Sequence, residues 1–429
     1  MKIALNSDGL RIFLSMFSGQ VLGQVFALLA TLFLARLYRP DAFAIFAIFS
    51  SIVAVLTPFI SGSLEGRIAY EPSLSKVERI KAAALMYAQF AGFFLLAFGV
   101  VILHPAFEKL VNTCCKSDPR LFLLAVLVSI SIALRTIAES VLLRQGKLLN
   151  MNVAVVMPIV MTPIISVVAW FFDFKTEGLV IAFSLASIVS AVFVFKFFVL
   201  FEPVLSSNLT QNFLVLRANI SYPLLLGTSS VLDAITASLP VLIGTTVLAS
   251  SVIGNFGLAQ KLLILPMAIL TNTLGKTYAN RLSFHSGNKN FHLLRYNVRL
   301  LLLFFLIGCF AMLFLLFVII PFLSIVLPER WSDSFLIFKL LAPALIVKLV
   351  ASSLGGSLLA SNSKNLLVFW KVIALISTYS VLRIYAGHDW RAYFHALAVN
   401  DIFLYALLLA FVLGSCNRYR VTVYEPNAV

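Results

Sequence analysis

The sequence predicts an all-α polytopic membrane protein with about twelve transmembrane helices. Of its 429 residues, 61% are hydrophobic and only 11% are charged, and the mean hydropathy of +1.02 is far above that of a soluble domain. The apolar segments are separated by short polar loops. Each segment has about the 20 residues that a helix needs to cross a bilayer core, which is too long for a barrel strand.

The expected spans fall into two sets of six. An even number of spans per set gives both halves the same orientation. We therefore expect two parallel six-helix lobes around a central cleft, with residues 1–205 in the N-terminal lobe and 206–429 in the C-terminal lobe, an architecture typical of transporters. The expected spans are 12–35, 42–64, 82–103, 121–143, 151–172, 178–201, 221–246, 252–275, 298–320, 335–359, 366–386 and 395–415.

The first span carries glycines and glutamines at helical spacing in GQVLGQ. Gly19 and Gly23 allow close helix packing. Gln20 and Gln24 either bond to a neighbouring helix or line a polar interior that contacts substrate. Both interpretations stay open here.

The second span begins after Pro40, which ends the preceding helix, with Asp41 as a plausible N-cap. It leaves the membrane at SGSLEGR, where Arg67 lies at the expected cytoplasmic surface. This arginine either contacts an anionic headgroup or only sets the topology.

The fourth span contains Arg135 and Glu139 four residues apart on one helix face. They can pair with each other. Alternatively, Arg135 faces a water-filled vestibule and receives an anion from the inner leaflet. In the next span, Pro158 and Pro163 free backbone carbonyls and permit a bend.

The second half places charges deep inside apolar runs, at Asp233, Lys261 and Lys348. A charge at the centre of a membrane helix costs about 2.5 to 3.5 kcal/mol on insertion scales. An ion pair between Asp233 and Lys348 inside one lobe is one explanation. The other makes Lys261 and Lys348 basic contacts in the cleft, with Asp233 as a coupling or gating carboxylate.

A weak internal repeat relates the second span to the eighth. RPDAFAIFAIFSSIVAVLTP is similar to SSVIGNFGLAQKLLILP, with Phe46 and Phe256 at like places. This similarity favours two matched lobes.

The net charge of +15 reflects membrane topology and not nucleic-acid binding. With the N-terminus inside, Lys and Arg are concentrated in the cytoplasmic loops, as the positive-inside rule requires. We therefore expect both termini in the cytoplasm.

The chain shows no Gly-rich phosphate loop, no paired His and carboxylate set and no metal-ligand spacing. The four cysteines also lack metal or redox spacing. We expect neither a cofactor nor a metal, and no enzymatic activity.

Five segments, in order, resemble the Wzx-type polysaccharide flippases of the MOP superfamily, which also holds the MATE exporters and the lipid II flippase. The similarity covers nearly the whole chain, although EGRIAYEP and the turn after Arg39 depart from the usual family pattern. The segments are ARLYRPDAFAIFAIFSS, GSLEGRIAYEPSLSKVERIKAAAL, LRQGKLLNMNVA, IGNFGLAQKLLILPMAILTNTLGKTYANRLS and VLPERWSDSFLIFKLLAPALIVKLVASSLGGSLLASN.

The resemblance implies a bacterial inner-membrane flippase. Its substrate would be an undecaprenyl-diphosphate-linked oligosaccharide, an O-antigen or other surface polysaccharide repeat unit of lipopolysaccharide biosynthesis, moved by alternating access. Basic groups at Arg135, Lys261 and Lys348 suit the diphosphate, and the polyprenyl tail would stay in lipid. Polymerase and chain-length regulator proteins are the expected partners.

Two alternatives remain. The first is a MATE-like drug or cation exporter, but three deep basic groups against two acidic ones favour an anionic substrate. The second is a membrane polysaccharide polymerase or ligase, which usually needs a large outside loop that this chain lacks.

Overall fold

Apolar helices account for the architecture, as the sequence predicted. The computed structural model describes residues 23–70, 74–102, 119–197, 209–220, 222–263, 293–355, 358 and 364–416, and no strand occurs among them. Ten helices in this part of the chain are long and apolar enough to span a membrane. This confirms the all-α polytopic class.

The helices coincide with the expected spans. Gly23–Leu37 and the helical segment 250–263 are the described parts of the first and eighth spans. The other elements are α2 (Pro40–Ser61), α3 (Leu64–Tyr70), α4 (Leu74–Ile102), α6 (Pro119–Arg144), α7 (Leu148–Phe171), α8 (Gly178–Phe197), α9 (Leu209–Ala218), η2 (Tyr222–Gly227), α10 (Thr228–Val247), α12 (Leu293–Phe314), η3 (Leu315–Ile319), α13 (Ile320–Val326), η4 (Glu329–Trp331), α14 (Ser332–Leu354), α16 (Lys364–Ile384), η5 (Tyr385–Gly387) and α17 (Trp390–Cys416).

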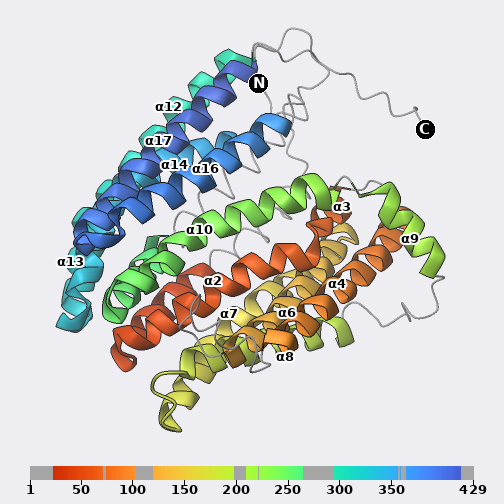
Figure 1. Cartoon of the computed structure of the whole chain (residues 1–429), viewed down its shortest axis with the longest axis horizontal. Coiled ribbons are helices and arrows are strands. Elements are labelled where there is room, and N and C mark those ends of the chain that lie inside the picture. Colours follow the sequence, from red (N-terminus) through yellow and green to blue (C-terminus); the bar gives the residue numbers. More distant parts are fainter. Residues whose placement is uncertain are drawn as a thin grey trace. The chain divides into compact units, whose positions relative to one another are not determined.

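The helices form two compact units, Met1–Gly254 and Asn255–Val429. The lobe boundary expected from the sequence, at 205/206, stays a prediction. In unit 1, α2 packs against α6 and α10, α4 packs against α6 and α9, and α7 packs against α8 (Figure 1). In unit 2, α14 packs against α17 and α12, and α16 packs against α17.

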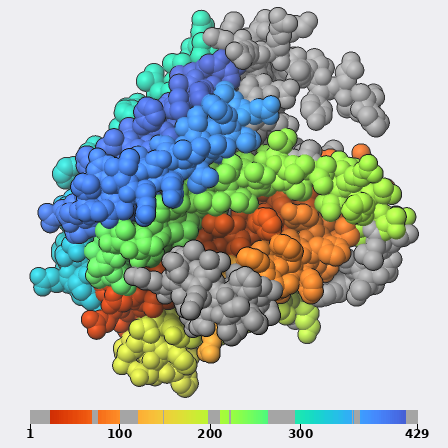
Figure 2. Space-filling model, in the orientation of Figure 1, coloured from red at the N-terminus to blue at the C-terminus, as the bar shows by residue number. Residues whose placement is uncertain are grey.

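The pairing of α2 with α10 brings residues far apart in sequence into contact. Figure 2 shows the side chains of α10, in green, lying against those of α2, in red. The two helices run antiparallel, because Ser63 beside the end of α2 contacts Ser230 near the start of α10. Further along, the Ser238 hydroxyl donates to the Ser51 carbonyl at 3.3 Å.

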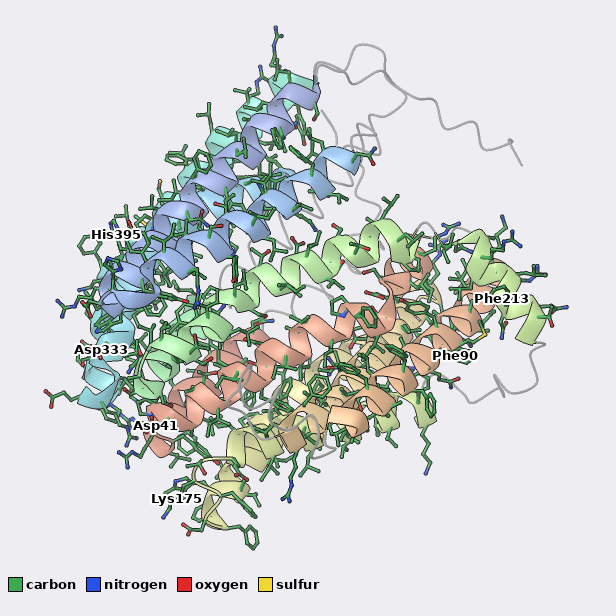
Figure 3. All side chains as sticks on the ribbon, viewed as in Figure 1. Asp41, Phe90, Lys175, Phe213, Asp333 and His395 are labelled. Carbon is green, nitrogen blue, oxygen red and sulfur yellow. The ribbon has the colours of Figure 1, made fainter. Side chains whose placement is uncertain are left out.

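Large apolar side chains are exposed along the outward helix faces, as lipid contact requires. Phe90 of α4 is 67% exposed and Phe213 of α9 is 59% exposed (Figure 3). In a soluble protein such surfaces would promote aggregation. In a bilayer they meet hydrocarbon.

Two prolines lie at or directly after π-helical turns, whereas the prolines inside α2, α7, α10 and α14 lie in regular α-helix. Pro223 lies in the π-helical turn η2, and η3 directly precedes the helix containing Pro321. Proline lacks an N–H donor and clashes with the preceding turn, so a wider turn relieves the helix locally. The regular α-helical hydrogen bonding is therefore replaced by a π-helical turn at Pro223.

The aromatic residues of the predicted repeat make equivalent contacts within their own units. Phe46 meets the Phe183 ring edge to face, with centroids 5.6 Å apart. Phe256 stacks on Phe394 at 4.8 Å. Phe183 and Phe394 lie near the starts of the sixth and twelfth spans, so both halves of the repeat use an aromatic pair between corresponding helices.

The helical segment 250–263 approaches the start of α2 closely at Gly254. A Cβ atom added at Gly254 would overlap the backbone of Pro40. Backbone cannot rotate away as a side chain can, so the helices would have to separate. Gly254 therefore sets the distance of this contact.

We predict that Gly254→Ala lowers thermal stability in detergent, with a loss of about 1 to 3 kcal/mol typical of overpacking. Gly414→Ala is the matched control, because Gly414 is helical and a Cβ there meets nothing within 4 Å. Its melting temperature should stay level or rise. Equal melting temperatures for Gly254→Ala and the parent would contradict the close contact.

Candidate functional site

Polar and charged side chains inside the apolar helices are the candidates for function, because their burial in a membrane must be compensated by partners or water. The sequence predicted eight such residues. The structure describes seven of them. Gln20 lies outside the described residues.

Arg135 and Glu139 lie side by side on α6. Arg135 Nε and Glu139 Oε1 are 3.1 Å apart, and the two side chains are 16% and 21% exposed. The atoms are close but not aligned for a hydrogen bond. The pairing that the sequence offered as one alternative is therefore present, and each side chain keeps some exposed surface.

Arg67 lies on α3 and contacts the residue that follows α9. Its Nε donates to Asn219 Oδ1 at 3.3 Å. The Asn219 amide in turn donates to the Val215 carbonyl at 2.8 Å. Arg67 therefore ties α3 to the loop after α9, in addition to any role toward an anion.

Glu65, two residues before Arg67, is a polar group that the sequence did not single out. Its side chain bonds to the Ser61 hydroxyl, whereas Oε2 is buried without a hydrogen-bond partner in the described part of the chain. Burial raises the pKa of this carboxyl, and bonds from Ser61 and from the backbone partly oppose the shift. In the sequence, the position of Glu65 directly after the second expected span could have marked it as a candidate.

Gln24 lies on the helix Gly23–Leu37 and is half-buried. Its Oε1 is buried and accepts no hydrogen bond from the described residues. Gly23 lies beside Val156 and Ile159, whose side chains would be 3.6 Å from an added Cβ. Gly23 therefore makes ordinary contact with α7, Gly19 lies outside the described residues, and the close packing of this pair and a substrate contact for Gln24 stay predictions.

Asp233 and Lys261 are both in helical segments. Asp233 is exposed on α10 of unit 1, and Lys261 is half-buried in the part of the segment 250–263 that belongs to unit 2. Each interacts with other groups. A coupling role for Asp233 and a substrate contact for Lys261 stay predictions. The pairing of Asp233 with Lys348 also stays a prediction.

Lys348 of α14 has partners on α17. Its Nζ lies 5.3 Å from the centroid of the Tyr405 ring, and it interacts electrostatically with Asp401. The carboxylate attracts the lysine cation through opposite charge, and the aromatic ring attracts it through a cation–π interaction. Asp401 was missed by sequence reasoning, although its place within the span 395–415 was a signal.

A second polar cluster lies next to Asp401, between α16 and α17. Ser377 Oγ donates to Asn400 Oδ1 at 2.6 Å, and Asn400 Nδ2 donates to Thr378 Oγ1 at 3.1 Å. Asn400 and Thr378 are buried. Such bonds hold two apolar helices together where lipid offers no alternative partner.

These contacts correct the expected charge balance. Asp401 joins Asp233 and Glu139 as a third acidic group within the spans, so the three deep basic residues are matched in number. Arg135 and Lys348 also lie near carboxylates. An excess of deep positive charge therefore no longer argues for an anionic substrate.

Among the described residues, no group of three or more His, Cys, Asp or Glu could hold a metal ion. The polar groups present are suited to hydrogen bonding and charge pairing. The arrangement can contact a polar ligand or change its pairing between conformations.

We predict that Lys348→Met lowers the melting temperature, because it leaves Asp401 without its cation. Because Lys348 and Asp401 are half-buried, the loss should be smaller than the about 3 to 5 kcal/mol typical of breaking a fully buried pair. The double variant Lys348→Met/Asp401→Leu should recover much of the loss. Lys339→Met, which alters an exposed lysine of the same helix, is the control, and additive losses in the double variant would contradict the pairing.

Comparison with known families gives a match along most of the chain. Residues 33–336 match a family model described as "Polysaccharide biosynthesis protein". No curated protein sequence matches significantly.

Solved structures share the fold at low sequence identity. The lipid II flippase MurJ in an inward closed conformation has a TM-score of 0.71 at 14% identity, over 94% of this chain and 89% of that one. A multidrug resistance MATE family transporter of the MOP superfamily, inward-facing, has a TM-score of 0.62 at 13% identity, over 92% and 96%. A MOP superfamily transporter from Pyrococcus furiosus has a TM-score of 0.59 at 14% identity, over 95% and 96%.

The match and the structural similarity confirm the resemblance to the MOP superfamily noted in the sequence. The helices, their order and their lengths agree with a multi-pass membrane protein. The chain belongs to the polysaccharide biosynthesis protein family and has the fold of the MOP superfamily.

Proposed function

We propose that the chain is a flippase that moves an undecaprenyl-diphosphate-linked oligosaccharide across the bacterial inner membrane. The cargo would be an O-antigen or other surface polysaccharide repeat unit, carried from the cytoplasmic to the periplasmic leaflet by alternating access between two six-helix lobes. No bond of the substrate changes. The protein would act as a transporter and not as an enzyme.

One observation carries this proposal: a chain of the polysaccharide biosynthesis family has the fold of a lipid flippase. Polysaccharide repeat units are assembled on polyprenyl lipids and must cross the membrane. A membrane protein of that family with a transporter fold fits this step. The similarity to a flippase fold does not support a polymerase or a ligase.

The polar residues suit different parts of such a cargo. Arg67, Arg135, Lys261 and Lys348 would contact the diphosphate through charge-assisted bonds, and Gln20 and Gln24 would meet the sugars. Because Arg135 already lies beside Glu139, binding an anion would require the arginine to exchange partners. Glu139 and Asp233 would then act in gating or coupling.

The proposed topology rests on the concentration of Lys and Arg in the expected cytoplasmic loops. Both termini would lie in the cytoplasm, where the repeat unit is made. The partners would be membrane lipid, the polymerase and the chain-length regulator.

A MATE-like drug or cation exporter is the second candidate. The similarity to MATE transporters and the equal numbers of deep acidic and basic residues favour it. The family match supports the flippase, because it connects the chain to polysaccharide.

We predict that Arg135→Ala or Lys348→Ala abolishes surface polysaccharide in cells that depend on this protein. The measurement is polymer on gels, normalised to the amount of protein in the membrane. Lys175→Ala, in the exposed loop between α7 and α8 (Figure 3), should leave polymer unchanged. Full polymer in both test variants would remove these residues from the mechanism.

We predict that Asp233→Asn impairs transport driven by an ion gradient, because the neutral amide lacks the charge with which a carboxylate attracts a cation and cannot release a proton. Transport into vesicles should be compared under imposed H⁺ and Na⁺ gradients. Unchanged rates under both gradients would rule out a carboxylate role at this position.

A further inference from the structure

The turn between α2 and α3 has an unusual backbone. Gly62 and Ser63 both have positive φ, at 57° and 54°. Glycine adopts this region freely, but a serine there is strained. Something must therefore hold Ser63 in place.

A chain of hydrogen bonds holds this turn and joins it to α10. The Ser61 hydroxyl bonds to Glu65, and the Ser63 backbone N–H donates to Ser61 Oγ at 3.2 Å. Ser63 Oγ then donates to Ser230 Oγ at 3.1 Å. These hydrogen bonds connect the half-buried Glu65 of α3 to Ser230 of α10.

Close backbone packing adds to the contact. A Cβ added at Gly227, which ends η2, would lie 3.2 Å from the Gly62 carbonyl oxygen. The helix α3 also packs against η2. The hydrogen-bonded turn therefore links the half-buried Glu65, whose Oε2 atom is buried, to the contact with η2 and α10.

We propose that Glu65 is a proton-binding site that controls the contact of α10 with the α2–α3 turn. The proton is bound while the turn packs against η2 and α10, and it is lost when they separate. The meaning for transport rests on the proposed function. Because α2 and α10 belong to one compact unit, proton release would accompany a movement of α10 against α2 within that unit.

The sign follows from the burial of Glu65. Burial disfavours the carboxylate and raises the pKa of Glu65, despite the bonds from Ser61 and the backbone. The state with the higher pKa is favoured as pH falls. Acid therefore favours the packed contact, and alkaline pH favours separation.

Charged and titratable groups on the neighbouring elements are not the cause of this shift. Burial raises the pKa and two hydrogen bonds lower it. The groups on the elements around the turn are Asp41 of α2, Arg67 of α3 itself, Lys76, Glu78, Arg79, Lys81 and Tyr87 of α4, Arg120, Arg135, Glu139 and Arg144 of α6, Arg217 of α9 and Asp233 of α10.

The test measures a distance in the full-length protein, in nanodiscs and without substrate. Phe59 of α2 and Leu224 of η2 are 43% and 64% exposed, and both are replaced by cysteine for spin labels after the four native cysteines are changed to serine. Electron spin resonance then gives the distance distribution between about pH 4 and pH 8, a range that includes the ordinary glutamate pKa of about 4.3.

We expect a single short distance at the acid end and a growing longer population as pH rises, with a midpoint above that of an exposed glutamate. Glu65→Gln, which is permanently neutral, should keep the short distance throughout. Glu78→Gln, at a carboxylate 46% exposed, should follow the parent. A parent that does not respond to pH, or a Glu65→Gln variant that responds as the parent does, would overturn the proposal.

A second variant keeps the test decisive if Glu65→Gln does not fold. Ser230→Ala removes the bond to Ser63 and should enlarge the longer population at every pH. An unchanged distribution would overturn the proposal. If the distances behave as expected but the protein moves no lipid-linked oligosaccharide, the proton site stands and the proposed function fails.

Discussion

The hydrocarbon core of the bilayer is the constraint on which the rest of this structure depends. It offers no hydrogen bonds, so every polar group inside it needs a partner from the protein or from enclosed water. The protein meets this need by pairing polar groups along and between helices. Arg135 lies beside Glu139, and Lys348 lies near Asp401 and Tyr405. These pairs compensate the cost of burial and also provide groups whose partners can change.

The α2–α10 contact shows how the same chemistry can serve movement. Serine hydroxyls bond across this contact at one end and near its middle, and Gly62 and Gly227 allow close backbone approach beside it. Hydroxyl bonds are individually weak, so the helices are held together without a large barrier to separation. A transporter that alternates between states needs contacts of this strength.

The fold was predictable because span length and hydropathy depend only on local sequence, and all twelve expected spans have a helical counterpart in the described residues. The site was less predictable. Arg135 and Glu139 share a helix face, so their pairing could be foreseen. Lys348 and Asp401 lie on different helices, and their proximity depends on how α14 packs on α17. The hydrogen bonds that connect Glu65, Ser61, Ser63 and Ser230 depend on the strained turn at Ser63. No local sequence pattern indicates this turn.

The central claim is that this chain moves a lipid-linked oligosaccharide between leaflets. The direct measurement uses purified protein in vesicles that contain an undecaprenyl-diphosphate-linked repeat unit, probed from outside with a membrane-impermeant reagent that modifies the sugar. The account predicts that reagent reaches nearly all of the lipid when the protein is present. Modification that stops at the outer leaflet, as in protein-free vesicles, would contradict it.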